Sequence, residues 1–354
     1  MAIEFRTEDA PPYGAVEQVS PLVRRVVARN PSRFTYHGTG TFLVGPPEGG
    51  RVAVIDAGPD DDDHVAAVLT AVQGQEVTHL LVTHTHPDHS PATAAIRSAT
   101  GAPTFGFGPH PEAAIRAHEE RKRRAVEADD EPESDDGEGG GDLAFVPDHP
   151  VAEGDLIEGD GFSFGCLHTP GHISNHVCFS FAEEQTLFSG DHVMGWSTSV
   201  IPAPDGDLND YLDNLRRLVG RNEVRYRPTH GPAIIDPGPY VEALVAHRES
   251  RERQIVEALA DGPRTIASLV AELYIDVHED LHKAAGASVY AHLLALHRAD
   301  RASLLVLERL MLGLTHEPLL LVASLRPTEE TGPTWRQALL ERIQNLHSTE
   351  TIEL

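Results

Sequence analysis

The chain has 354 residues, two cysteines and a formal net charge of −27 at pH 7. Two cysteines are too few for a disulfide framework, and a chain of this length predicts one large domain with its own core plus a smaller one. The acidic balance disfavours long-range attraction of nucleic acid.

The first residues, MAIEFRTEDAPPYGAV, have neither the basic start nor the apolar centre of a secretory signal, so we expect a cytoplasmic protein. The apolar stretch 303–325 is interrupted by Glu308, Arg309 and Pro318, short of the roughly 20 apolar residues that cross a bilayer. We therefore expect no membrane association. The same stretch fits a homodimer interface and extra core packing equally well.

Strands and helices alternate in the first part of the chain. The β-branched run 51–56 predicts a strand ending at Asp56, and the aspartates behind it predict a capped helix. Residues 77–84 predict the next strand. Ser90 followed by Pro91 predicts the N-cap and first residue of a second helix. The loop between strand 77–84 and this second helix therefore lies at the carboxyl end of the strand.

Residues 119–142 are charged and then rich in glycine, serine and acid, which predicts a disordered insertion. Beyond it, short apolar runs predict further strands at 161–169, 176–182, 185–191 and 224–230. Strands interleaved with helices predict a layered α/β domain over residues 1–247.

The pattern changes near residue 248. Residues 248–306 predict three helices, the second opened by Thr265, and then a short apolar strand, which is the outline of a winged-helix-like domain. Residues 307–354 form a tail with a predicted helix near 334–346.

Four residues in the loop after strand 77–84 follow the pattern H-x-H-x-D-H: His84, His86, Asp88 and His89. Zinc prefers imidazole nitrogen and carboxylate oxygen, and residues two apart in an extended segment point to the same side. The first two histidines can therefore reach one ion. Because the chain turns after Pro87, the last two residues can serve a second ion nearby.

The motifs THTHPDH, TPGH, SGD and PTHG occur in the order and context of the metallo-β-lactamase superfamily, which the chain resembles over about residues 31–248. The resemblance implies the αββα sandwich of that superfamily, here followed by the winged-helix-like domain. It implies these ligands of a first metal: His84, His86 and His172. It implies these ligands of a second: Asp88, His89 and His230. Asp191 would bridge the two ions.

The implied cofactors are two divalent metal ions, with zinc as the expected metal. Such a pair can share a hydroxide and make it a nucleophile near neutral pH, so the implied reaction is hydrolysis. Asp88 would also hold that hydroxide or relay its proton. Asp56 resembles the acid that orients a ligand histidine, its alternative being a plain turn residue. His176 and His192 either touch substrate or support the ligands.

The segments GDHVMGWSTSV and GPAIIDP, with the winged-helix-like domain, look most similar to the β-lactamase-like protein 2 branch. This implies an endoribonuclease or phosphodiesterase acting on single-stranded RNA. A thioester hydrolase resembling hydroxyacylglutathione hydrolase shares all seven ligands, so a small-molecule substrate stays open. The aspartate at position 191 argues against antibiotic hydrolysis as the main activity.

Two further hypotheses remain. A non-enzymatic binding protein is opposed by the complete set of seven ligands, since loss of function should have removed one of them. A mononuclear iron oxygenase of the same superfamily would be identified by one iron per chain. Zinc is the expected metal, and iron and manganese are its alternatives.

Overall fold

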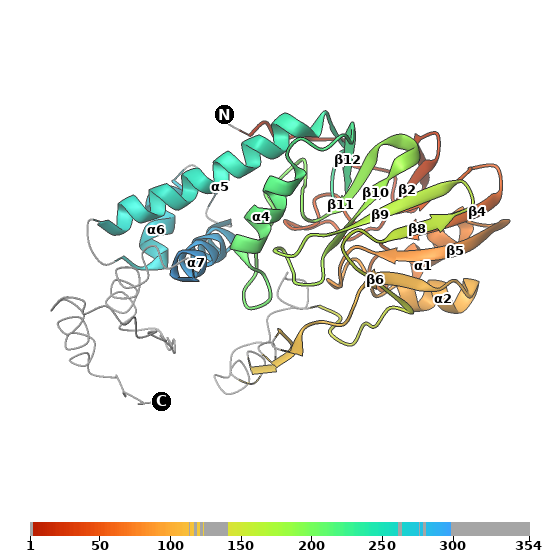
Figure 1. Cartoon of the computed structure of the whole chain (residues 1–354), viewed down its shortest axis with the longest axis horizontal. Coiled ribbons are helices and arrows are strands. Elements are labelled where there is room, and N and C mark those ends of the chain that lie inside the picture. The colour runs from red at the N-terminus through yellow and green to blue at the C-terminus, as the bar shows by residue number, and fades with distance from the viewer. Residues whose placement is uncertain are drawn as a thin grey trace. The chain divides into compact units, whose positions relative to one another are not determined.

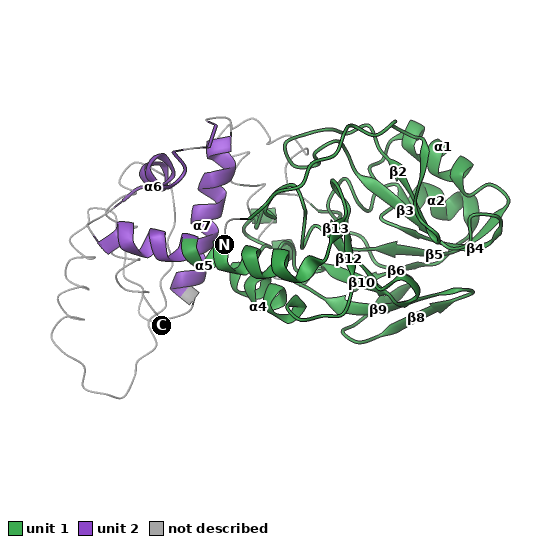
Figure 2. Cartoon of the chain, turned by 90° about the horizontal axis from the view of Figure 1, so that it is seen from above, with its two compact units in different colours: residues 1–250 green, residues 251–354 purple. Residues whose placement is uncertain are grey.

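The computed structural model describes residues 3–112, 114–116, 119–120, 123, 141–260, 264–275, 277–278 and 281–298. The chain forms two compact units, residues 1–250 and 251–354, which Figure 2 shows in different colours. Most of the predicted insertion 119–142, the strand expected after the third C-terminal helix, and the tail 307–354 lie outside the described residues.

Two sheets form the first unit. The seven-stranded sheet has the order β1 to β7: Val16–Ser20, Val23–Val27, Gly40–Val44, Gly50–Ile55, Gln75–Val82, Thr104–Phe107 and His149–Val151. The six-stranded sheet has the order β13 down to β8: Ile234–Ile235, Arg225–Pro228, Thr186–Gly190, Val177–Phe181, Phe162–His168 and Leu156–Gly159. Among the described residues, the helices that begin in this unit include α1 Asp62–Ala71, α2 Thr93–Thr100, η1 Ala182–Glu184, α4 Leu208–Leu218 and α5 Pro237–Ala260.

Apolar side chains fill the space between the two sheets. Phe42 and Leu81 from the first sheet share a buried cluster with Phe164 and Phe188 from the second. The ring centroids of Phe42 and Phe188 are 5.2 Å apart. Successive residues of a strand point to opposite faces, so the neighbour Leu80 belongs to a second cluster outside the sandwich.

Helices cover the outer faces. Val68 of α1 and Ile96 of α2 pack with Val54 and Leu80 on the outside of the first sheet. α4 buries six of its side chains, and Figure 1 shows it beside the strands of the second sheet. The layer order helix, sheet, sheet, helix confirms the predicted αββα sandwich.

The strand directions bring several loops to one edge. β4 and β5 are parallel neighbours, as are β11 and β12. β9 runs in the direction of β11 because both are antiparallel to β10. Since strands of one direction end at the same edge of a sheet, the loops after β9, β11 and β12 can meet one another.

The predicted capping of α1 is confirmed, because the Asp61 side chain accepts a hydrogen bond from the His64 amide at 2.7 Å. The prediction for the second helix is wrong. α2 begins at Thr93, and Ser90 precedes it in a turn. The amide of Ser90 bonds to the carbonyl of His86, and this turn delays the start of the helix.

The second unit contains the end of α5 together with α6, Ile266–Leu273, and α7, His282–Arg298. Ile255, Leu269 and Val289 are among the buried residues that hold the three helices together. Thr265 caps α6 as predicted, in a reciprocal pair with Ser268. The first of these helices, α5, begins at Pro237, earlier than the start predicted near residue 248. Proline is tolerated in the first turn of a helix, so Pro237 permits this earlier start.

Among the described residues, no helix combines the length and apolar character needed to cross a membrane.

Candidate metal centre

The H-x-H-x-D-H loop follows β5, at the edge where the strands of the sandwich end. The structure places the three distant candidates against this loop: His172 follows β9, Asp191 follows β11, and His230 follows β12. Three groups of side chains have ligand atoms within 4.8 Å of one another, and together they contain all seven predicted ligands: His84, His86, Asp88, His89, His172, Asp191 and His230.

The first donor group consists of His84, His86 and His172. The Nε2 atom of His84 lies 3.0 Å from Nδ1 of His86, and Nε2 of His172 lies 2.9 Å from the same Nδ1. Nitrogens bound to one tetrahedral zinc at about 2.0 Å are about 3.3 Å apart. The spacing of the three nitrogens is therefore close to that of a metal site.

The second donor group consists of Asp88, His89 and His230. Oδ2 of Asp88 lies 3.0 Å from Nε2 of His230 and 3.4 Å from Nε2 of His89. Oδ2 of Asp191 lies between the two groups, 3.6 Å from His89 Nε2 and 3.9 Å from His172 Nε2. One carboxylate oxygen is thus within reach of both groups.

Backbone carbonyls set which ring nitrogen faces the centre. His172 Nδ1 donates to the carbonyl of Val200 at 2.6 Å, and His230 Nδ1 donates to the carbonyl of Gly38 at 3.2 Å. A neutral imidazole that donates through Nδ1 keeps a lone pair on Nε2. Both Nε2 atoms can therefore coordinate a cation.

Asp56 orients a third histidine. Its carboxylate is fully buried and accepts hydrogen bonds from His89 Nδ1, from the amide and hydroxyl of Thr83, and from the hydroxyl of Thr229, at 2.8–2.9 Å. Asp56 also has a positive φ of 50°, which is strained for a residue with a side chain. The carboxylate is therefore held in place and fixes His89 with Nε2 toward the centre.

Burial and charge act differently on the two donor groups. Burial and neighbouring imidazoles lower the pKa of His86 to about 3. Burial would also lower the pKa of His230, but the carboxylates of Asp191 and Asp88 outweigh it and raise that pKa to about 10. Burial would raise the pKa of Asp88, but His89 and His230 hold it below its usual range. Burial therefore keeps the histidines of the first group neutral. The carboxylates favour a positive charge at the second group, which either a proton on His230 or a bound cation can supply.

The donor set fits a metal ion. Nε2 of His89 and Oδ1 of Asp191 are buried and have no hydrogen-bond partner among the described residues. Buried polar atoms without a partner are costly, and such atoms are expected where a cation binds.

His176 and His192 lie behind the donor groups, in fully buried positions. His176 bonds through Nδ1 to the Thr169 hydroxyl and accepts a hydrogen bond at Nε2 from the amide of Asp191. The His192 ring packs on Tyr211 with centroids 4.8 Å apart. Both positions are suited to supporting the ligands.

Several residues near the centre were not predicted. Thr39 donates a hydrogen bond to Asp88 at 3.0 Å, and Thr229 donates to Asp56. Both lie in motifs already singled out, GTGTFLVG and PTHG. Thr229 directly precedes the predicted ligand His230, whereas Thr39 has no predicted ligand beside it in the sequence.

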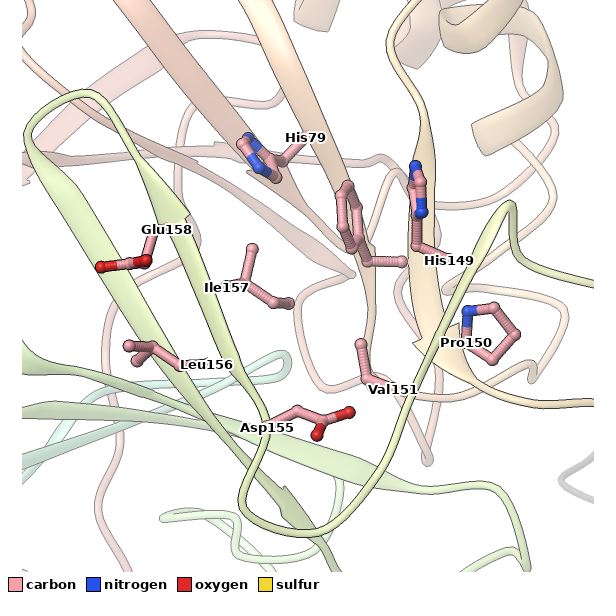
Figure 3. Close-up of a pocket in the computed structure, with 9 residues that line it drawn as sticks. His79, His149, Pro150, Val151, Asp155, Leu156, Ile157 and Glu158 are labelled. Carbon is pink, nitrogen blue, oxygen red and sulfur yellow. The ribbon is translucent and has the colours of Figure 1, made fainter.

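A separate hollow of about 410 Å³ lies between the edge strands of the two sheets. Figure 3 shows Leu156, Ile157 and Glu158 on one side and His79 and His149 on the other. None of the seven predicted ligands lines it, so the hollow is distinct from the candidate centre.

The family comparisons agree with this geometry. The model of the metallo-beta-lactamase superfamily matches residues 38–230, and that of the beta-lactamase associated winged helix domain matches residues 265–304. The Beta-lactamase-like protein 2 homolog of Drosophila melanogaster is 30% identical over 293 residues, covering 81% of this chain and 91% of its own. The Atrochrysone carboxyl ACP thioesterase of Claviceps purpurea is 27% identical over 280 residues, covering 77% of this chain and 78% of its own.

Among solved structures, a metallo-beta-lactamase family protein from Thermus thermophilus aligns with a TM-score of 0.62 at 23% identity. The alignment covers 80% of this chain and 95% of that chain, and it supports the fold. The chain therefore belongs to the metallo-β-lactamase superfamily of hydrolases and carries the winged helix domain associated with it.

Proposed function

We propose that the protein is a dinuclear zinc hydrolase that cleaves a thioester. The position of Asp191 carries the two-metal part of this proposal. Its Oδ2 atom lies 3.9 Å from His172 Nε2 in the first donor group and 3.4 Å from His230 Nε2 in the second. A carboxylate in that position suits a bridging ligand, and the imidazole and carboxylate donors suit zinc.

Two zinc ions held there would supply a water of lowered pKa and a Lewis acid for the acyl carbonyl oxygen. The chain supplies the proton acceptor. Asp88 is the most exposed of the predicted ligands, with 22% of its side chain accessible, and Thr39 holds its Oδ2 by a hydrogen bond. We assign Asp88 to take the proton of the attacking water. Asp56 keeps the His89 ring in the orientation that leaves its Nε2 lone pair available.

Two observations favour a thioester as the substrate. The net charge of −27 opposes the approach of a polyanion, whereas an acyl thioester can be neutral near the bond that breaks. The Claviceps relative is named an ACP thioesterase. The thioester is therefore the first substrate class to test.

Single-stranded RNA is the second candidate. The helix α7, within the matched winged helix domain, has Lys283 and no aspartate or glutamate from residue 282 to 298. Because this helix has no carboxylate side chains, it should repel the phosphate backbone of RNA less than the rest of this acidic chain does.

The experiment compares substrates on one preparation. The protein is analysed for metal as purified, and is then loaded with zinc and assayed on S-lactoylglutathione, an acyl-carrier-protein thioester, single-stranded RNA and bis-p-nitrophenyl phosphate. We expect thioester turnover that a chelator abolishes and zinc restores, with two zinc ions per chain by metal analysis. RNA cleavage without thioester turnover would select the second candidate, and one iron per chain would reject the dinuclear hydrolase.

Asp191→Asn tests the bridging position. The amide loses the charge that would hold both ions, so we expect the rate to fall by at least about 100-fold. Asp160→Asn removes an exposed carboxylate and serves as the control with an unchanged rate. Equal rates for the two variants would exclude the two-metal mechanism.

A further inference from the structure

A polar cluster that contains none of the predicted ligands lies beside the first donor group. It consists of Thr85, His110, Asn175 and Asp205, and we call it the Thr85 brace. Thr85 is the residue between the first two histidines of the H-x-H-x-D-H loop. The other three come from separate segments of the chain, so the fold has gathered these four side chains around that loop.

The hydroxyl of Thr85 is at the centre of the brace. Its Oγ1 lies 2.6 Å from Nε2 of His110 and accepts a hydrogen bond from Nδ2 of Asn175 at 3.1 Å. Nδ1 of His110 lies 3.4 Å from Oδ2 of Asp205. Thr85, His110 and Asn175 are all buried, whereas Asp205 retains 20% side-chain exposure.

These contacts imply one direction for the hydrogen bonds. Oδ2 of Asp205 lies at ion-pair distance from Nδ1 of His110, without the geometry of a hydrogen bond, and its charge favours a ring proton on Nδ1 and a lone pair on Nε2. The Thr85 hydroxyl then donates to His110 and accepts from Asn175. Burial would raise the pKa of Asp205, but His110 and Ser174 outweigh it and keep this carboxyl ionised, with a pKa below its usual range.

The brace connects the segments that carry the first donor group. Asn175 lies three residues after His172, in the same loop. Asp205 lies in the loop whose Val200 carbonyl holds the ring of His172. The carbonyl of Thr85 also accepts a hydrogen bond from the amide of Asp142 at 2.7 Å.

We propose that Thr85, His110, Asn175 and Asp205 are positioning residues for the first donor group. They hold the backbone between His84 and His86 against the loop of His172, so that the three ring nitrogens are already arranged when a metal ion arrives. Hydrogen-bonded residues behind metal ligands commonly act in this way. The inference rests on the proposed metal site, and it adds that the arrangement is fixed by residues outside the ligand set.

The test uses the full chain and measures zinc binding directly. The metal is removed from wild type, Thr85→Val and Thr85→Ser, and zinc is titrated back in competition with a chromophoric chelator. Valine keeps the shape of threonine and removes the hydroxyl, so we expect the dissociation constant of one of two zinc sites to rise about 10- to 100-fold. Serine keeps the hydroxyl and is expected to retain an affinity near that of wild type.

Thr104→Val is the matched control. Thr104 is also a buried threonine whose hydroxyl makes two hydrogen bonds, both to Asp148, at the start of β6. We expect this variant to unfold at a lower temperature and to bind both zinc ions normally. Equal weakening by Thr85→Val and Thr104→Val, or no weakening by Thr85→Val, would overturn the inference.

His110→Phe tests whether the residues act as a unit. It removes both ring nitrogens, so its effect on zinc affinity should resemble that of Thr85→Val. The double variant should then be no weaker than either single variant, because residues in one network are not additive. Fully additive losses would show that the two residues act separately.

Hydrogen exchange separates this inference from the proposed function. In metal-free protein, Thr85→Val should speed amide exchange in peptides covering residues 83–90 and 172–176, and Thr104→Val should not. If wild type bound no zinc, the proposed function would fail while the exchange experiment still decided the role of the brace. Unchanged exchange at both segments would reject the brace.

Discussion

At the scale of single residues, the candidate centre depends on which nitrogen of each histidine carries its proton. His172 and His230 donate through Nδ1 to backbone carbonyls, and His89 donates through Nδ1 to the carboxylate of Asp56. All three therefore turn Nε2 toward the centre. Metal affinity at this centre should consequently be sensitive to residues that never touch the metal.

Asp56→Asn gives the first prediction at this scale. A carboxylate accepts four hydrogen bonds here, whereas an amide has one oxygen and must place its NH₂ group against a donor. We expect the dissociation constant for zinc to rise about 10- to 100-fold in the competition titration. Asp60→Asn, at an exposed position nearby, should leave it unchanged. Wild-type affinity in Asp56→Asn would show that His89 does not need this partner.

At the scale of elements, the turn that carries His172 is defined by close backbone packing against α4. Gly171 has a φ of +141°, and a Cβ atom built there would lie 2.4 Å from the Cα of Tyr211. Only glycine fits such an approach. The TPGH motif is therefore a structural requirement as well as the source of the predicted ligand His172.

Gly171→Ala tests this packing. The clash must be relieved by moving α4 or the turn, so we expect the free energy of unfolding in urea to fall by more than about 2 kcal/mol and zinc binding to weaken. Gly165→Ala, in β9, is the matched control, because a Cβ there would lie 3.9 Å from its nearest neighbour. Its free energy of unfolding should change by less than about 1 kcal/mol. A Gly171→Ala variant as stable as Gly165→Ala would contradict the argument.

At the scale of the whole molecule, the net charge of −27 acts on any charged substrate. Salt screens this repulsion, so cleavage of single-stranded RNA should become faster between about 50 and about 200 mM salt. Hydrolysis of S-lactoylglutathione, whose charge is small compared with that of RNA, should change much less over the same range. The opposite slope for RNA, as in basic nucleases, would show that a local positive surface governs its binding.

Much of the fold was predictable, because strand and helix signals are local. The strand that ends just before Asp56, the strand before His84 and the cap at Thr265 all follow from residues close in sequence. The start of α2 was missed because a hydrogen-bonded turn around His86 and Ser90 overrides the capping preference of serine. The ring of His110 next to Thr85 has no sequence signal, since it depends on how β6 pairs with β5.

The sequence by itself determined the types of the predicted ligands and the local loop, because imidazole and carboxylate spacing within six residues needs no tertiary information. It also allowed the superfamily to be identified from four short motifs. Only the tertiary structure brought His172, Asp191 and His230 to that loop. It also set which ring nitrogen of His172 and of His230 donates to a backbone carbonyl. The physical reason is that ligand distances and hydrogen-bond partners depend on strand direction and on contacts between segments far apart in the chain.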